Sequence, residues 1–309
     1  MLIIVSIINN PFSGKDLPVE CHIECRAKIN LYLGITGRRE DGYHDIETVF
    51  QPVSICDHIR VTDAPSGIAL CRDDDSIKWD RDNLCYRAAE RLFKAAGYRR
   101  GVKIEVRKKI PHGAGLGGGS SDAAGVLLGL NSFLKLGLSR NRLIEIALGI
   151  GSDIPFFVYN QPAIGRGRGE ILEGIDGIRG VYILLVMPDI RVNTSVAYKK
   201  NDLMLTKDES RYKLGVFLEG LNRIPRGRIR SHNTFEESVC AGYPEIEEIL
   251  FLLRENEDSI FSSISGSGST CFSVFADKDE ADDEYHFITG KGYRGLVVEP
   301  REKTIRLEC

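Results

Sequence analysis

The stretch PHGAGLGGGSSDAAG, residues 111–125, has glycine at six of its fifteen positions and then continues into small helix-forming residues. A strand-like run, VKIEV at 102–106, precedes it, so the order is strand, glycine-rich loop and helix. Glycines let backbone N–H groups approach a ligand, and a helix start carries partial positive charge. We therefore predict a loop that binds phosphate, with the helix running from Ser120 or Ser121 to about Leu136. The alternative is a loop that only allows a helix to pack closely on a sheet.

Within the loop, Gly113, Gly115 and Gly118 match the G-x-G-x-x-G pattern that also marks dinucleotide-binding folds. Such a fold needs an acidic residue about twenty positions further on, and residues 135–142 contain none. The protein-kinase and Walker forms fail as well, because the required valine and the G-K-[ST] element are missing. The loop thus indicates phosphate binding of another kind.

Length and composition are those of an ordinary globular protein. The 309 residues are 42% hydrophobic and 28% charged, and the net charge is −3, which argues against nucleic acid and an anionic membrane as partners. The eight cysteines form no C-x-x-C pair, so we expect a reducing, cytoplasmic location rather than a disulfide framework. The apolar N-terminus is too short to span a bilayer, and residues 1–18 are expected to be an extension or an edge strand.

Residues 19–33 alternate between apolar and polar side chains almost perfectly. Period two over this length predicts a strand whose odd positions, from Val19 to Leu33, face the core. Lys28 and Asn30 are then expected to project together from the other face. A lysine on an exposed strand face is usually only solvated, so its functional weight depends on what lies beside it.

Asp153 stands in GSDIPFF, just before a helix start that contains proline. This pattern predicts an N-cap, since a carboxylate can accept hydrogen bonds from the first free N–H groups. Capping is compatible with catalysis, because a helix N-terminus keeps a carboxylate ionised and able to act as a base. A phosphate loop, a carboxylate and a fixed cation such as Lys28 are together the groups that phosphoryl transfer needs.

Three motifs in this order resemble the GHMP family of small-molecule kinases: AKINLYL at 27–33, the glycine loop at 111–125 and SISGSGSTCFSVF at 263–275. The resemblance covers nearly the whole chain. It implies an α+β fold of two domains, the first like ribosomal protein S5 domain 2 and the second ferredoxin-like. We expect these domains at 19–170 and 171–309, since the pattern of elements changes between residues 155 and 180.

The blocks GRREDGYHDIETVFQPV, DNLCYRAAERL, GSDIPFFVYNQPAIGRGRGE and HNTFEESV are similar to the branch of the family that uses ATP to phosphorylate the 2-hydroxyl of a cytidine-diphosphate-linked methylerythritol, in the non-mevalonate route to isoprenoid precursors. The resemblance implies that Lys28 and Asp153 form the catalytic pair, with Asp153 taking the hydroxyl proton. It places Asn83, Leu84 and Lys108 around the adenine, and Pro111, Gly113, Ala114, Gly115, Leu116, Gly117, Gly118, Gly119, Ser120 and Ser121 around the ATP phosphates. It places Asn30, Tyr43, His44, Gly266, Ser267 and Gly268 around the cytidine-diphosphate substrate. Mg²⁺ is expected with ATP, held mainly by phosphates and water.

Other interpretations stay open on the sequence alone. A related kinase acting on another alcohol would share the glycine loop, a nucleotide-binding regulator could keep the loop and lose catalysis, and a dinucleotide oxidoreductase is the third possibility. His112 stands where the family usually has an apolar residue, and Ile164 replaces an aromatic of some relatives, so differences are expected in affinity rather than in the reaction. The basic run at 223–230 is expected to be a solvated loop.

Overall fold

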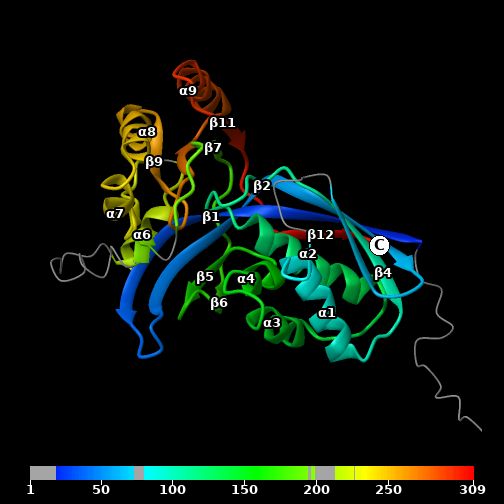
Figure 1. Ribbon diagram of the computed structural model, residues 1–309. Helices are drawn as coiled ribbons and strands as arrows, with labels where there is room; N and C mark the ends of the chain where they lie inside the picture. Colours follow the sequence, from blue (N-terminus) through cyan, green and yellow to red (C-terminus); the bar gives the residue numbers. More distant parts are fainter. Residues whose placement is uncertain (1–18, 73–79, 194–195, 199–212, 226) are drawn as a thin grey trace, which may run out of the picture.

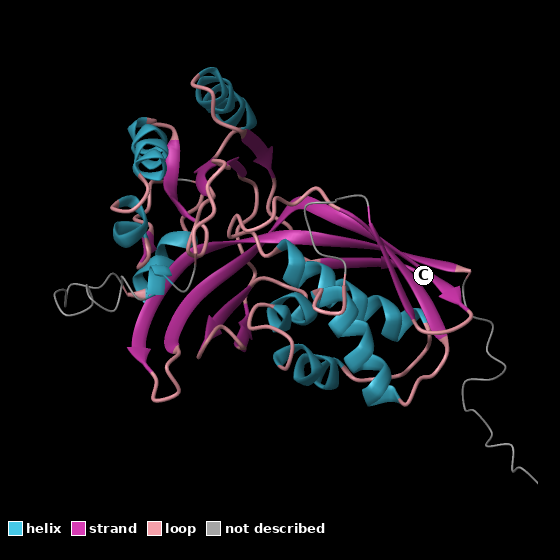
Figure 2. Cartoon of the chain, in the orientation of Figure 1, coloured by secondary structure: helices cyan, strands magenta, loops and turns pink. Residues whose placement is uncertain are grey.

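The structure is a computed structural model that describes residues 19–72, 80–193, 196–198, 213–225 and 227–309 (Figure 1). The extension expected at 1–18 lies outside these residues. Within them the chain forms two sheets with helices packed against them (Figure 2). The expectation of an α+β fold in two parts is therefore confirmed.

The first sheet has eight strands in the part of the chain that the structure describes. They are β1 (Glu20–Arg38), β2 (His44–Ala64), β3 (Ile68–Arg72), β4 (Gly101–Arg107), β5 (Ala163–Arg166), β6 (Ile171–Gly174), β8 (His232–Asn233) and β12 (Ile305–Glu308). The main order is β12-β1-β2-β4-β3, while β5 pairs with β2 and β6, and β8 pairs with β1. Because β8 and β12 come from the C-terminal part of the chain, both halves of the sequence contribute to this sheet. The domain limits 19–170 and 171–309 stay a prediction.

Strands β1 and β2 form a long hairpin that the sequence only partly indicated. The polar stretch 36–47 carries paired backbone at Gly37↔Asp45 and Arg38↔His44. The apolar runs VFQPVSI and HIRV both belong to the single strand β2. Polar side chains here mark the exposed end of paired strands, because backbone pairing does not depend on side-chain polarity. A disulfide between Cys21 and Cys309, which the cysteine pattern did not indicate, ties β1 to the chain end.

Four helices lie against the first sheet: α1 (Leu84–Ala96), α2 (Gly118–Phe133), α3 (Arg140–Leu148) and α4 (Ile154–Tyr159). The Asn83 side chain caps the start of α1, and Gly97 ends the helix in the left-handed region (φ 65°). Helix α2 begins at Gly118, earlier than expected, because Gly117 at φ 71° already turns the loop into the helix.

The close packing of α2 on β1 depends on two glycines inside the helix. A Cβ at Gly125 would be 3.2 Å from Ile23 Cγ2 and closer still to Cys25 Sγ, and one at Gly129 would be 3.0 Å from Ile23 Cγ1. Contacts under about 3.4 Å between carbon atoms are repulsive. The sequence left open that the glycines of this region only allow a helix to pack closely on a sheet. Gly125 and Gly129, which lie in α2 beyond the loop, have that role.

The second sheet has the order β11-β7-β10-β9. Its strands are β7 (Tyr182–Val186), β9 (Ser259–Ile264), β10 (Cys271–Phe275) and β11 (Gly295–Val298), and the helices of this part are α6 (Leu214–Leu221), α7 (Glu236–Cys240), α8 (Pro244–Glu255) and α9 (Lys278–Gly290). One face, with Leu184 and Phe275, packs with residues of α8 and α9. The other face, with Leu185 and Phe272, shares a core with β1. The two sheets thus meet along β1, where the site lies.

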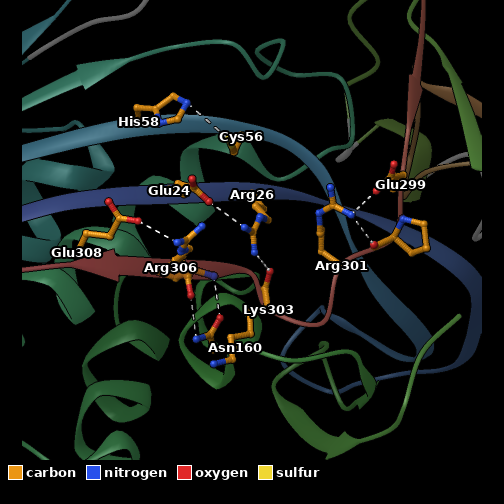
Figure 3. Close-up of polar contacts among 12 residues, drawn as sticks. Glu24, Arg26, Cys56, His58, Asn160, Glu299, Arg301, Lys303, Arg306 and Glu308 are labelled. Atoms are coloured by element: carbon orange, nitrogen blue, oxygen red, sulfur yellow. Dashed lines mark hydrogen bonds and ion pairs between the residues drawn. The ribbon is translucent and has the colours of Figure 1, made fainter. Parts of the chain in front are cut away.

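The C-terminal segment returns to the first sheet and is fixed by polar contacts, several of which are drawn in Figure 3. Arg26 donates to Lys303 O (3.1 Å), and the Asn160 side chain both accepts from Ile305 N (2.7 Å) and donates to Ile305 O (3.1 Å). Thr304 Oγ1 donates to Phe157 O (2.8 Å). Phe157 belongs to α4, and Asn160 is the first residue after this helix. The C-terminal segment therefore holds α4 in place, and with it Asp153 at the start of α4.

Candidate active site

Strand β1 changes the direction of its side chains where the site begins. Its register against β2 shifts between Arg26 and Lys28. Before the shift, Cys25 packs in the core beneath α2, and after it, Ile29 packs in the core shared with the second sheet. The irregularity therefore turns Lys28 toward the glycine-rich loop, and the Lys28 backbone N–H donates to Leu116 O (3.0 Å).

Lys28 and Asn30 are both 3% exposed. The prediction that they share a face is confirmed, since Lys28 Nζ donates to Asn30 Oδ1 (2.6 Å). The neighbouring odd positions Ala27 and Ile29 pack in a core, so Lys28 and Asn30 do project from the opposite face, as expected. That face is buried rather than solvated. Burial lowers the pKa of the Lys28 ammonium, and the negative charge of Asp153 opposes this only in part.

Asp153 occupies the N-cap position of α4, yet within the described structure its side chain accepts no capping hydrogen bond. Its φ and ψ of −84° and −17° are helical rather than extended, so the carboxylate does not reach back to the first N–H groups. The predicted capping contact was therefore wrong. The carboxylate instead faces a cavity of about 370 Å³.

This cavity, which we call the central cavity, brings together residues from distant parts of the chain. Of those predicted from sequence, it is lined by Lys28, Asn30, Gly115, Gly117, Ser120, Asp153, Gly266 and Ser267. It is also lined by Leu33, Ile46, Phe50, Gly151, Ser152, Arg168, Tyr198 and Phe235, which the sequence did not single out. The apolar members of this second group follow the patterns of core residues, so nothing in the sequence marked them as lining a cavity.

The glycine loop and the third motif touch directly across the central cavity. Ser265 Oγ donates to Gly115 O (2.9 Å), and a Cβ at Gly115 would be 2.9 Å from Gly268 O and closer still to Ser265 O. Gly266, at φ 59°, lies where an added Cβ would be 3.5 Å from Lys28 Nζ. Glycine at 115 and 266 thus lets two backbone loops close around Lys28.

The other residues predicted for the phosphate loop lie around the cavity rather than in its lining. Ala114 and Leu116 anchor the loop in the core, and Ser121 Oγ donates to Arg26 O (2.7 Å). Gly118 packs on Ile110, and Gly268 faces Val192 and Val239. Pro111, Gly113 and Gly119 lie further out on the loop, partly or fully exposed.

The three residues predicted around the adenine lie outside the cavity lining. Asn83 Oδ1 accepts from Cys85 N (2.9 Å), and Leu84 Cδ1 lies 3.7 Å from where a Cβ of Gly119 would be, so both residues flank the end of the loop. The Lys108 ammonium donates to the carboxylates of Asp57 and Asp122. An adenine contact from Lys108 would therefore have to use its backbone.

The residues predicted for the cytidine end lie beside the cavity. Tyr43 is 56% exposed, and the Arg168 guanidinium lies 4.8 Å from the centre of its ring. His44 is buried, and its ring stacks on that of Tyr198 at 4.8 Å. Burial raises the pKa of the Tyr198 phenol to about 12, with a further contribution from the charge of Asp153. Since Arg168 and Tyr198 line the central cavity, they connect it to Tyr43 and His44.

Three further positions singled out in the sequence lie elsewhere. His112 is exposed, whereas Ile164 is buried in the core shared with the second sheet. Part of the basic run, from Arg228 to Arg230, lines a separate cavity of about 460 Å³. Arg228 is exposed and donates to the carbonyls of Arg254 and Asn256 (3.3 and 3.1 Å), so this run is held on the second part of the fold.

The described residues contain no group of three or more His, Cys, Asp or Glu side chains that could hold a metal ion. No helix among them is long and apolar enough to cross a membrane.

Comparisons with known proteins agree with this arrangement. The model of the GHMP kinases N terminal domain matches residues 83–161, and that of the GHMP kinases C terminal domain matches residues 221–294. The 4-diphosphocytidyl-2-C-methyl-D-erythritol kinase of Syntrophotalea carbinolica is 38% identical over 89% of this chain and 96% of its own length. The enzyme of the same name from Geobacter sp. is 37% identical over 82% of this chain and 89% of its own.

Solved structures show the same fold. A crystal structure of 4-(cytidine 5'-diphospho)-2C-methyl-D-erythritol kinase is similar with a TM-score of 0.77 and 32% identity, over 90% of this chain and 98% of that one. A homoserine kinase from Cytophaga hutchinsonii has a TM-score of 0.71 at 15% identity, over 95% and 99% of the two chains, which shows a shared fold only. The chain belongs to the GHMP kinase family, where it stands beside the 4-diphosphocytidyl-2-C-methyl-D-erythritol kinases.

Proposed function

We propose that this protein transfers the γ-phosphoryl group of ATP to the 2-hydroxyl of 4-diphosphocytidyl-2-C-methyl-D-erythritol, a step in the synthesis of isoprenoid precursors. The observation that carries the proposal is the shared lining of the central cavity, where Lys28, Asp153 and glycines of both loops meet. The names of the relatives that match most of the chain support the choice of substrate.

The glycine loop is proposed to hold the ATP phosphates. Its glycines at 113, 115 and 117 all have positive φ, a backbone conformation that can point successive N–H groups at one anion. The start of α2 at Gly118 adds the partial positive charge of a helix N-terminus. Mg²⁺ would enter as the MgATP complex, held by phosphate oxygens and water, a common arrangement for this ion. The bound ion would neutralise charge on the transferred group.

In the transfer itself, the oxygen of the 2-hydroxyl forms a bond to the γ-phosphorus, and the bond from that phosphorus to the bridging oxygen of ADP breaks. The hydroxyl proton goes to the carboxylate of Asp153. The Lys28 ammonium, held by Asn30 (2.6 Å), orients the hydroxyl and balances the negative charge that develops between donor and acceptor. Burial of Lys28 strengthens this effect, because an ionic interaction is stronger where water is excluded.

The acceptor is proposed to extend from Asp153 toward Tyr43 and His44. The existing stack of His44 on Tyr198 is a flat surface on which a pyrimidine ring can lie. Tyr43 is exposed and can stack from the other side, while Arg168 beside it offers a cation to the diphosphate. Gly266 and Ser267 would close the wall next to Lys28.

Measuring ADP release with three alcohols tests the proposal. We expect turnover with 4-diphosphocytidyl-2-C-methyl-D-erythritol and none with mevalonate or homoserine. No turnover with the first substrate would refute the proposed function. The Asp153→Asn variant should bind ATP normally and lose at least a hundredfold in kcat, as expected for the loss of a general base. If Asp153→Asn turns over at the rate of the unchanged protein, another residue is the base.

A further inference from the structure

A cluster of three charged side chains lies buried at the base of the glycine loop. Asp57 comes from β2, Lys108 directly follows β4, and Asp122 lies in α2. Their side chains are exposed by 0%, 8% and 4%. The Lys108 ammonium pairs with both carboxylates, at 2.6 Å from Asp122 Oδ2 and closer to Asp57 Oδ2. We call these three residues the carboxylate–lysine cluster.

The cluster fixes both ends of the glycine loop. Asp57 Oδ1 accepts hydrogen bonds from the backbone of Lys109 and of Ile110 (2.9 Å), the two residues that lead into the loop. At the other end, a Cβ at Gly118 would be only 3.5 Å from Asp57 Oδ2, and Asp122 follows four residues later on α2. Any change in the charge of the cluster therefore acts directly on the backbone that is proposed to surround the phosphates.

The charges of the cluster do not balance when both carboxylates are ionised. Two negative groups share one ammonium, and Asp122 Oδ1 is buried without a hydrogen-bond partner in the described structure. The charge of Asp122 acts in turn on the thiols of Cys25 on β1 and Cys85 on α1. Burial, and then the charge of Asp122, raises the pKa of both thiols well above the usual value, so both stay neutral. Among the residues that the structure describes, Lys108 is the cation whose charge acts on Asp122.

Burial and the charge of Asp57 raise the pKa of the Asp122 carboxyl to about 7, although Lys108 acts in the opposite direction. Burial alone would lower the pKa of the Lys108 ammonium, but Asp122 and Asp57 outweigh it and the pKa is raised. Lys108 therefore stays charged, and Asp122 is the member of the cluster that exchanges a proton near neutral pH.

We infer that binding of the ATP phosphates to the glycine loop is linked to the uptake of one proton by Asp122. Ionised, the cluster has a net charge of −1 directly below a loop that must hold a polyanion. With Asp122 protonated, the cluster is neutral. The Oδ1 of Asp122, which has no partner in the described structure, then carries a hydrogen that it can donate. Asp122 is then a positioning residue that acts through the loop backbone. The inference rests on the proposed function, since it takes ATP as the ligand of the loop.

Calorimetric titration of the full chain with MgATP, without acceptor, tests the inference. Measured in two buffers of different ionisation enthalpy, the difference in heat gives the number of protons taken up. We expect close to one proton at pH 8 and little uptake at pH 6, with Kd rising toward tenfold per pH unit above pH 7, the limit for one linked proton. ATP binding with no proton uptake at pH 8 would overturn the inference.

Two variants separate Asp122 from other sources of protons. Asp122→Asn keeps the oxygen that accepts from Lys108 and is neutral at every pH, so it should bind MgATP without proton uptake and with a Kd that changes little between pH 7 and 8.5. Asp63→Asn, which removes an exposed carboxylate on the same strand β2, should keep the uptake of the unchanged protein. Uptake retained in Asp122→Asn would overturn the inference.

Two other outcomes are also decisive. If Asp122→Asn does not fold, the unchanged protein still tests the linkage, because binding without uptake in the two buffers overturns it and uptake of one proton with the expected pH dependence supports it. If MgATP does not bind at any pH, both the proposed function and the linkage fail. If MgATP binds without proton uptake, only the linkage fails.

Discussion

The Lys28 ammonium donates a 2.6 Å hydrogen bond to the side-chain oxygen of Asn30, two positions further along β1. The amide of Asn30 in turn donates to Thr48 Oγ1 (2.8 Å), and that hydroxyl donates to Tyr32 O (2.7 Å). All of these groups are buried. A chain of buried hydrogen bonds thus fixes the ammonium in the central cavity, so its position depends on Asn30 and Thr48.

Replacing Asn30 by leucine should lower kcat with little change in the KM for ATP. The variant keeps the volume but removes the acceptor, which leaves a buried ammonium without its hydrogen bond. Losing a hydrogen bond to a charged group costs about 1.5–3 kcal/mol, which corresponds to roughly 10–150-fold in kcat if it is lost at the transition state. Steady-state kinetics at saturating acceptor measure this effect. Thr48→Val is the matched comparison, with a smaller fall expected because the acceptor of Lys28 remains.

The lowered pKa of Lys28 predicts an early alkaline limit of the reaction. Burial disfavours the charged ammonium, so it loses its proton at a lower pH than an exposed lysine does. The kcat/KM for ATP, which reports ionisations of the free protein, should therefore fall on the alkaline side at a pH below the usual value of 10.5 for lysine. A pH profile of kcat/KM from 7 to 10.5 measures the limit. Lys28→Arg keeps its charge throughout this range, so its profile should show no such alkaline fall, even if the rate is lower. The same fall in that variant would show that another group causes it.

Local patterns in the sequence predicted the order of strand, glycine-rich loop and helix, and the shared face of Lys28 and Asn30, because each depends on neighbours within a few positions. The turn of Lys28 toward the glycine-rich loop could not be predicted in this way. It depends on the register shift between Arg26 and Lys28, which arises from pairing with β2. A sequence with perfect alternation gives no sign of such a shift.

The cavity residues that the sequence missed have a common physical origin. Phe50, Tyr198 and Phe235 are aromatic residues in apolar surroundings, as core residues are. They differ from core residues only because one side of each ring lines the central cavity. Asp57 likewise stands alone in strand β2 and gains its partners Lys108, Lys109 and Ile110 from the segment that follows β4. These are contacts between segments far apart in the chain, and they form only when the sheets come together.

Gly115→Ala should separate the two loops that close the central cavity, whereas Gly113→Ala should not. Both glycines have positive φ, 78° and 73°, so the backbone strain of an alanine is similar at the two sites. At Gly115 the new Cβ would also press on Ser265 O and Gly268 O, while at Gly113 its nearest neighbour is Arg191 Cγ at 4.0 Å. We expect Gly115→Ala to raise the KM for ATP and lower kcat at least tenfold beyond Gly113→Ala. If Gly115→Ala and Gly113→Ala change kcat and the KM for ATP to the same extent, contact between the loops is unimportant.

Glu284 on α9 is a buried carboxyl outside the active site. It is 5% exposed and accepts a hydrogen bond from Asn256 Nδ2 (2.5 Å), while its other oxygen has no partner in the described structure. Burial raises the pKa of this carboxyl, and the hydrogen bond from Asn256 offsets the rise in part. The folded protein therefore holds the Glu284 proton at a pH where the unfolded chain has released it.

This difference in proton binding predicts how stability depends on pH. Where the folded state binds more protons, the free energy of unfolding falls as pH rises, here from the unfolded pKa of 4.5 up through the raised folded value. Glu284→Gln keeps an acceptor for Asn256 and cannot ionise, so it should gain stability relative to the unchanged protein between pH 4.5 and pH 8. Urea unfolding at several pH values measures the difference, with Asp283→Asn, an exposed neighbour on the same helix, as the control that should change nothing. A stability difference for Glu284→Gln that is constant over this range would mean that Glu284 is ionised in the folded protein despite its burial.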